Sequence, residues 1–144
     1  MTLAPSRLSR RLLTLYSLLL AFVGFWPTPV DKPAQGTLDS LFRFLHRRGF
    51  PDWFGYNLLE SSANAMLFVP VGILAALSFP GSRWWHNAGI GMLASLCIEL
   101  GQMLFLEARY PSWFDVAANT LGTILGVAGV RLWRRRPQRS HRAR

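Results

Sequence analysis

The chain has 144 residues, of which 51% are apolar, and a formal net charge of +9. The length fits one domain. The apolar residues form long blocks instead of the one-sided stripes of a small soluble protein, so we exclude a small soluble protein and expect a lipid bilayer around the helices. The single cysteine, Cys97, excludes an internal disulfide. His46, His86 and His141 have no metal-ligand spacing, so no metal or other cofactor is expected.

The charge is strongly basic, with 16 Lys and Arg residues against seven Asp and Glu residues. Such a balance is compatible with nucleic-acid binding. Here, however, the Arg residues lie outside the apolar blocks and cluster at the two termini, which is how charge orients helices in a membrane. We therefore expect no nucleic-acid partner, and a basic tail at residues 134–144 that is attracted to anionic lipid headgroups.

The first apolar block, Leu12–Trp26, follows Arg7, Arg10 and Arg11 and so resembles a signal peptide. The sequence after it, Trp26-Pro27-Thr28-Pro29, has no small-x-small cleavage site. We predict an uncleaved transmembrane helix that starts as early as Leu8, although it is shorter than the roughly 20 residues of a usual span.

The long connection at residues 27–55 contains a second helical pattern. Leu38, Leu41, Phe42 and Leu45 repeat at i, i+3, i+4 and i+7, and most of the basic residues lie on the opposite side: Arg43, His46, Arg47 and Arg48. This spacing predicts a short amphipathic helix. It either lies in the outer headgroup layer or caps the helix bundle.

Three further apolar blocks cover Tyr56–Phe79, Trp85–Leu106 and Trp113–Trp133. Indole rings favour the headgroup boundary, and every tryptophan lies near a block end: Trp26, Trp53, Trp84, Trp85, Trp113 and Trp133. The predicted fold is therefore all-α, a polytopic membrane protein with a four-transmembrane-helix bundle and the amphipathic helix in its first external loop. Residues 1–133 form the transmembrane domain and residues 134–144 a cytoplasmic tail.

The distribution of Lys and Arg predicts the orientation. With both termini in the cytoplasm, 11 basic residues lie inside and five outside, four of the five in the one long connection. Positive charge is retained on the cytoplasmic side, so we predict an N-in, C-in topology.

Polar residues inside the blocks are the candidates for function, because an ionisable group at the bilayer centre costs about 2.5–3.5 kcal/mol on insertion scales. In the predicted topology they reach the same depth, in the outer half of the membrane, and Arg109 lies at that level too. Helical spacing places each group on one face of its helix. The groups are Glu60 and Asn64, then Ser95, Glu99 and Gln102, and then Asp115 and Asn119.

The last block continues its polar face with glycines at Gly122, Gly126 and Gly129. Glycine lets helix backbones approach closely, so this helix is predicted to pack at the bundle centre with Asp115 and Asn119 pointing inward. Gly89 and Gly91 are suitable partners on the preceding helix. Pro70, close to Gly72, is expected to free a carbonyl and kink the second span.

Each polar residue also has a purely structural interpretation. Asn64, Gln102 and Asn119 would hydrogen-bond between helices as packing groups, and Asp115 would cap its helix. Glu60 would be solvated at the interface. Glu99 and Arg109 would form a structural ion pair, whereas in a functional site a carboxylate pair would share a proton or bind the guanidinium.

These residues also carry a family resemblance. The segment Asn64-Ala-Met-Leu-Phe-Val-Pro-Val-Gly72 resembles the N-x-x-L-F-x-P-x-G motif of the VanZ-like membrane protein family. Glu99-Leu-Gly-Gln102 resembles its E-x-x-Q motif, and Arg109 with Asp115-Val-Ala-Ala-Asn119-Thr-Leu-Gly122 resembles its R…D-x-x-x-N-x-x-G motif. The match covers about residues 57–130 and leaves out the basic tail.

The resemblance implies a four-helix, multi-pass protein of the bacterial cytoplasmic (inner) membrane with a link to the cell envelope. The family's name comes from a component associated with resistance to teicoplanin, a lipid-tailed glycopeptide antibiotic, and implies neither a reaction nor resistance for this chain. The binding candidates within the motifs are Asn64, Glu99, Gln102, Arg109, Asp115 and Asn119.

Three functions remain open from the sequence. The first is a non-enzymatic envelope protein whose outer polar site binds a lipid headgroup or another amphiphile, with membrane lipids as partners. The second is an intramembrane enzyme acting on lipid-linked groups, with Glu99 or Asp115 as general base and Arg109 holding a phosphate. The third is a transporter or channel, for which four short helices without inverted repeats offer little room unless the chain forms an oligomer.

Overall fold

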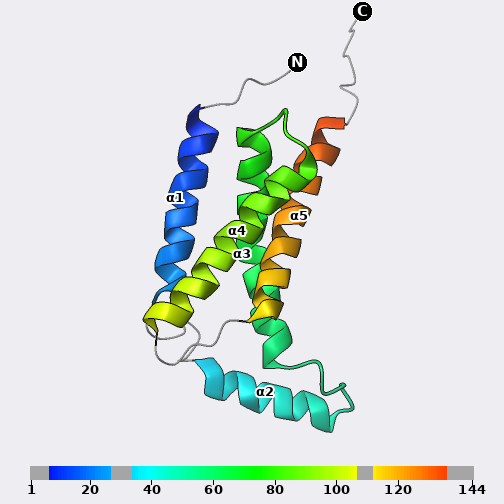
Figure 1. The fold of residues 1–144 in the computed structure, drawn as a ribbon. Helices are drawn as coiled ribbons and strands as arrows, with labels where there is room; N and C mark the ends of the chain where they lie inside the picture. The colour runs from blue at the N-terminus through cyan, green and yellow to red at the C-terminus, as the bar shows by residue number, and fades with distance from the viewer. Residues whose placement is uncertain (1–6, 27–33, 107–111, 136–144) are drawn as a thin grey trace, which may run out of the picture.

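The computed structural model describes residues 7–26, 34–106 and 112–135, and this part of the chain is almost entirely helical. The helices follow one another along the chain (Figure 1). In order they are α1 (Arg7–Gly24), α2 (Gln35–Arg47), α3 (Tyr56–Ser78), α4 (Trp84–Phe105) and α5 (Trp113–Arg135).

Three of the described helices, α3, α4 and α5, are long and apolar enough to cross a membrane. They have 22 or 23 residues each, and at about 1.5 Å rise per residue this matches a hydrocarbon core of about 30 Å. The fourth predicted span, α1, starts at Arg7 and carries Arg10 and Arg11, so its apolar part is shorter. It runs alongside α3, and the start of α1 and the end of α5 lie at the same end of the bundle (Figure 1). The four-span count stays a prediction.

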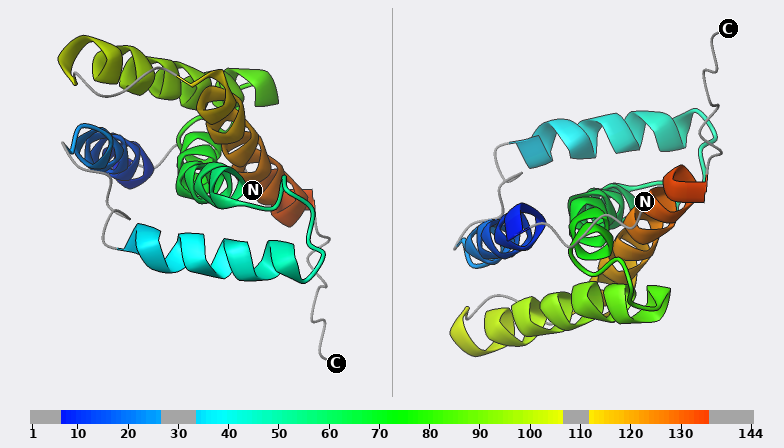
Figure 2. Two further views of the ribbon diagram at one scale, coloured as in Figure 1. Left: turned by 90° about the horizontal axis from the view of Figure 1, so that it is seen from below. Right: turned by 90° about the horizontal axis from the view of Figure 1, so that it is seen from above.

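The bundle has small residues inside and large apolar residues outside. Helix α3 lies in the middle, with α1, α4 and α5 around it (Figure 2). Val71 and Ala75 of α3 are fully buried, whereas Phe105 and Phe114 are 76% and 83% exposed. Large exposed apolar patches of this kind mark a surface that another apolar medium covers. Together with the length of the apolar helices, this surface is consistent with a membrane protein.

The glycines of α5 bring it close to α3. A Cβ atom at Gly122 would overlap the carbonyl oxygen of Ala65, and one at Gly126 would overlap that of Val69. Gly72 of α3 in turn lies against the backbone of Thr123. The prediction of close packing through glycine is therefore right for Gly122 and Gly126, with α3 as the partner of this face.

Two parts of the glycine prediction are wrong. Gly129 is exposed, and an added Cβ there would meet nothing within 4 Å. Val130 continues the buried face of α5 instead, because at about 100° per residue it lies nearer the centre of that face. Gly89 is likewise open, so only Gly91 of the two expected α4 glycines makes a close approach, to the Thr123 side chain.

Helix α1 packs against the middle of α3. Leu20 is buried in one cluster with Phe68 and Val71, and the Tyr16 hydroxyl donates a hydrogen bond to the Leu67 carbonyl over 2.8 Å. Pro70 has no N–H, so a backbone carbonyl in the preceding turn of α3 lacks its usual hydrogen-bond donor. The hydrogen bond from Tyr16 lies next to this position. Pro70 does not end α3, which continues to Ser78.

Helix α2 lies across the end of the bundle opposite the described termini (Figure 1). It ends at Arg47, and Gly49, two residues later, has a φ of +91°, the left-handed conformation that glycine adopts after helix C-termini. The Gly49 and Phe50 amides donate to His46 and Leu45 carbonyls, as in a Schellman motif. A helix is therefore present where the sequence predicts one. Whether it lies in a headgroup layer or caps the bundle stays a prediction.

We expect cysteine labelling in intact cells to report the N-in, C-in orientation. Native Cys97 is exposed and must first be replaced by serine. Gly81→Cys, in the α3–α4 turn, and Asp52→Cys, before α3, both place the thiol at exposed positions at opposite ends of α3. A membrane-impermeant maleimide should label Cys at position 52 and reach position 81 only after permeabilisation, because the basic end is retained inside. Labelling of position 81 in intact cells contradicts the orientation.

Candidate functional site

The polar residues of α3 and α5 meet at the first turn of α5. The Asn64 amide nitrogen donates to Asp115 Oδ1 over 3.1 Å, and both side chains are half-buried. Asn64 comes from the third turn of α3 and Asp115 from the first turn of α5. Because the two helices run in the same direction and both begin at the α2 end of the bundle, these positions reach the same depth (Figure 1).

Glu99 of α4 holds the start of α5. Its carboxylate Oε2 accepts a hydrogen bond from the Ser112 backbone amide over 2.8 Å, and the residue is only 8% exposed. Ser112 itself is the N-cap, because its Oγ accepts from the Asp115 amide over 3.2 Å. A negative charge at a helix N-terminus is also favoured by the helix dipole. Glu99 therefore ties α4 to the start of α5 through this hydrogen bond.

Asn119 and Ser95 form the deepest contact of the layer. The Asn119 amide nitrogen donates to Ser95 Oγ over 2.9 Å, and Ser95 is fully buried. The other side of the same amide, Oδ1, is buried with no hydrogen-bond partner. An unsatisfied buried acceptor costs about 1–3 kcal/mol, so an N–H or O–H group that reaches this oxygen is stabilised.

Gln102 extends the layer to α1. Its amide nitrogen donates to the Gly24 carbonyl over 2.7 Å, at the last residue of α1. The last carbonyls of a helix have no partner within the helix, so Gln102 satisfies one of them. This contact shows that the layer includes the end of α1 as well as α3, α4 and α5.

The structure therefore brings together five of the predicted binding residues: Asn64, Glu99, Gln102, Asp115 and Asn119. The sixth, Arg109, lies outside the described residues. Glu60 is exposed, which agrees with the interpretation that this side chain is solvated at the membrane interface. Ser112, not Asp115, is the N-capping residue of α5, while Asp115 lies in the first turn, where a negative charge is favoured, and is bonded to Asn64.

Two members of the layer were missed from the sequence. Ser112 stands three residues before Asp115, and a Ser-x-x-acidic spacing before an apolar block is the usual pattern of a helix start, so this signal was present. No sequence pattern indicates the Gly24 carbonyl as a partner, because a backbone acceptor is available at the end of any helix.

The described side chains of the layer present mainly acceptors. The two carboxylates and the Asn119 oxygen accept, and the Asn64, Gln102 and Asn119 amide nitrogens already donate within the protein. Each carboxylate can accept more than one hydrogen bond. Such a set is suited to a polar group rich in N–H or O–H donors.

The comparison with known proteins agrees with the motifs found in these helices. The family model described as VanZ/LLP1 matches residues 13–134, which includes every described residue of the polar layer. No curated protein and no solved structure matches the chain. Because the model covers most of the sequence, from α1 to the last turn of α5, the chain belongs to the VanZ family.

Proposed function

We propose that this VanZ-family chain is a multi-pass protein of the bacterial cytoplasmic membrane whose polar layer binds the headgroup of a lipid or another amphiphile. The observation that carries the proposal is the buried, unpartnered Oδ1 of Asn119 beside Ser95. Glu99 and Asp115 add carboxylate acceptors in the same layer. An amphiphile suits this arrangement because the outer surface of the helices is apolar while the layer is polar.

The acceptors define the chemistry of the headgroup. A ligand that donates hydrogen bonds, such as an ammonium or a sugar hydroxyl, would satisfy the Asn119 oxygen, whereas a fully methylated ammonium would not. A teicoplanin-type lipoglycopeptide combines sugar hydroxyls with a lipid tail. We therefore propose that such an amphiphile competes for the layer, which would link the chain to glycopeptide susceptibility.

The second candidate function is an intramembrane enzyme acting on lipid-linked groups. A general base needs a carboxylate oxygen within reach of the proton that it removes. Glu99 Oε2 is engaged by the Ser112 amide and Asp115 Oδ1 by Asn64, so both carboxylates are held by the protein itself. These contacts suit a rigid binding site.

Lipid retention by the purified full-length chain tests the proposal. We expect native mass spectrometry to show about tenfold tighter retention of phosphatidylethanolamine, which has N–H donors, than of phosphatidylcholine, which has none, since one hydrogen bond to a buried group is worth about 1.5 kcal/mol. Asn119→Ala should abolish this preference. Cells that express this variant should then also show the teicoplanin susceptibility of cells without the protein.

Ser95→Ala is the matched control. It breaks the same Ser95–Asn119 hydrogen bond but leaves the Asn119 oxygen in place, so it should keep the preference for phosphatidylethanolamine. Equal retention of the two lipids by the wild-type chain, or equal loss of the preference in both variants, contradicts the proposal.

A further inference from the structure

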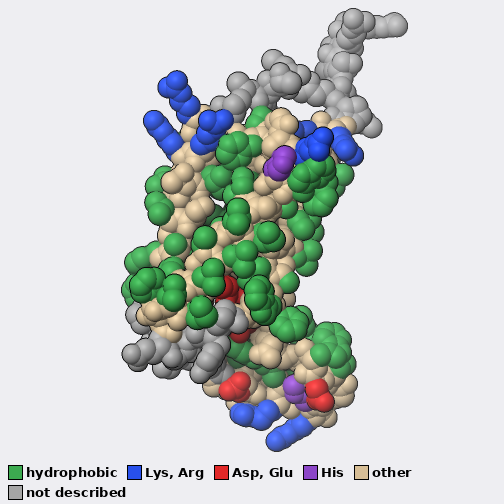
Figure 3. Space-filling view, in the orientation of Figure 1, with side chains coloured by type: hydrophobic (Ala, Val, Ile, Leu, Met, Phe, Trp, Pro, Cys, Tyr) green, Lys and Arg blue, Asp and Glu red, His purple; other side chains and the backbone are tan. Residues whose placement is uncertain are grey.

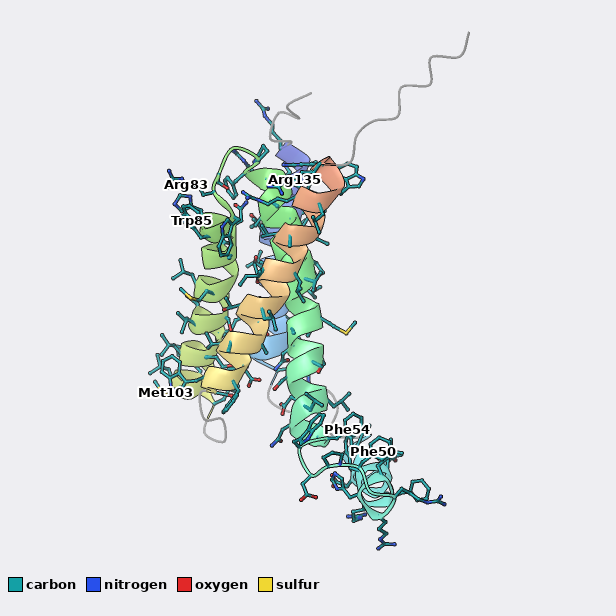
Figure 4. All side chains as sticks on the ribbon, turned by 90° about the vertical axis from the view of Figure 1, so that its right-hand side faces the viewer. Phe50, Phe54, Arg83, Trp85, Met103 and Arg135 are labelled. Carbon is teal, nitrogen blue, oxygen red and sulfur yellow. The ribbon has the colours of Figure 1, made fainter. Side chains whose placement is uncertain are left out.

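The end of the bundle opposite the polar layer carries positive charge with no acidic side chain to balance it. Residues 1–30, 61–98 and 116–144 contain no Asp or Glu. The basic side chains gather at this end and, separately, on α2, while the acidic ones appear only in the other half of the molecule (Figure 3). Arg83 and Arg135 both lie here, at the opposite end from Phe50 and Phe54 (Figure 4). The counter-charge for this end must therefore come from outside the described helices.

A cavity of about 250 Å³ opens at this end, between the C-terminal ends of α3 and α5 and the first turn of α4. With a water molecule occupying roughly 30 Å³, this volume holds a group much larger than a single water. Its lining combines a small apolar wall with basic and amide side chains: Ala76, Pro80, Asn87, Arg131, Arg134 and Arg135.

The hydrogen bonds around the cavity orient its lining. Arg131 Nη2 donates to the Ser82 carbonyl over 3.0 Å, which holds this half-buried guanidinium at the α3–α4 turn. The Ser82 hydroxyl lies 2.7 Å from Asn87 Oδ1 and 2.8 Å from the Phe79 carbonyl oxygen, and its single proton goes to one of these two acceptors. The donors that the lining offers to a ligand are the guanidinium N–H groups and the Asn87 amide nitrogen, and these recognise an anion.

The start of α4 also favours an anion at the cavity. Its N-cap residue, Arg83, makes no side-chain capping bond, so the first amides of α4 keep their partial positive charge. Trp84 and Trp85 on this turn and Trp133 near the end of α5 are 45%, 47% and 60% exposed. Exposed indoles favour the headgroup depth of a bilayer. In the predicted topology these indoles place the cavity at the depth of the phospholipid phosphate groups.

We propose that this cavity binds the phosphate group of an anionic phospholipid, through Arg131, Arg134 and Arg135. The site is separate from the polar layer and does not depend on the function proposed for it. Guanidinium groups bind phosphate oxygens in bidentate pairs, which gives geometric selectivity as well as charge. The apolar wall of Ala76 and Pro80 faces the glycerol and the first acyl carbons.

Lipid binding by the full-length chain in detergent micelles tests this proposal. Phosphatidylglycerol retention, measured by native mass spectrometry, is compared between the wild-type chain, Arg134→Gln/Arg135→Gln and Arg7→Gln/Arg10→Gln. Both double variants remove two charges from the same end, but only the first changes the cavity. We expect about thirtyfold weaker retention in the cavity variant and less than about threefold in the control.

Two further arms complete the test. Arg131→Lys keeps the charge and removes the planar fork, and should weaken retention while the chain stays folded by circular dichroism. If millimolar inorganic phosphate displaces phosphatidylglycerol, the site recognises the phosphate group alone. If phosphatidylglycerol stays bound, the site recognises the whole lipid headgroup. Both results support a phosphate site. Equal weakening in the two double variants, or equal retention of zwitterionic phosphatidylcholine, overturns the proposal.

Discussion

Replacing Gly122 by alanine is expected to lower the free energy of unfolding by about 1–3 kcal/mol, the range for overpacking a closely packed site. The added methyl group would overlap the Ala65 carbonyl oxygen, which belongs to the backbone of α3 and cannot turn away. Helices α3 and α5 would have to separate along the contact that Gly126 and Gly72 also form. Unfolding of the purified chain in mixed dodecylmaltoside and SDS micelles, followed by circular dichroism, measures the change.

Gly129→Ala is the matched control, since it makes the same chemical change on the same helix. A Cβ atom at Gly129 meets nothing within 4 Å, so this variant should gain the better helix propensity of alanine, up to about 1 kcal/mol. The two substitutions are thus expected to have opposite signs. If both stabilise or both destabilise the chain to the same extent, the glycine contact between α3 and α5 is not as described.

Replacing Glu99 by leucine should destabilise the start of α5. The substitution removes the carboxylate that accepts from the Ser112 amide and leaves a half-buried N–H without this partner. Hydrogen bonds to charged groups contribute about 1.5–3 kcal/mol, and we expect a loss in that range in the same micelle assay. Amide hydrogen exchange at Ser112, Asp115 and Val116 should become faster, because the first turn of α5 then frays more easily.

Two variants control for this result. Glu99→Gln keeps a carbonyl oxygen as acceptor and should lose less than half as much stability. Leu100→Ala changes a neighbouring side chain that is 51% exposed on the apolar surface and should leave exchange in α5 unchanged. Unchanged exchange at Ser112 in Glu99→Leu would show that Glu99 does not hold this helix start.

The sequence by itself determined the helices and the polar side chains Asn64, Glu99, Gln102, Asp115 and Asn119 of the layer. In a bilayer every backbone amide must be satisfied within its own segment, so an apolar block of sufficient length forms a helix whatever it packs against. The predicted blocks Tyr56–Phe79, Trp85–Leu106 and Trp113–Trp133 accordingly differ from α3, α4 and α5 by one or two residues at their ends. Polar residues are costly in such blocks, which is why Asn64, Glu99 and Asn119 were recognisable without a structure.

Only the tertiary structure decided which of these groups meet. Helical spacing places Gly122 and Gly126 on one face of α5, but it does not say whether α3 or α4 lies against that face, since all three helices are apolar on every side. The bond from Gln102 to the Gly24 carbonyl and the cavity at Arg131 depend on helix ends far apart in the chain. Their positions follow from how closely the helices pack, which side-chain volume and backbone approach settle in three dimensions.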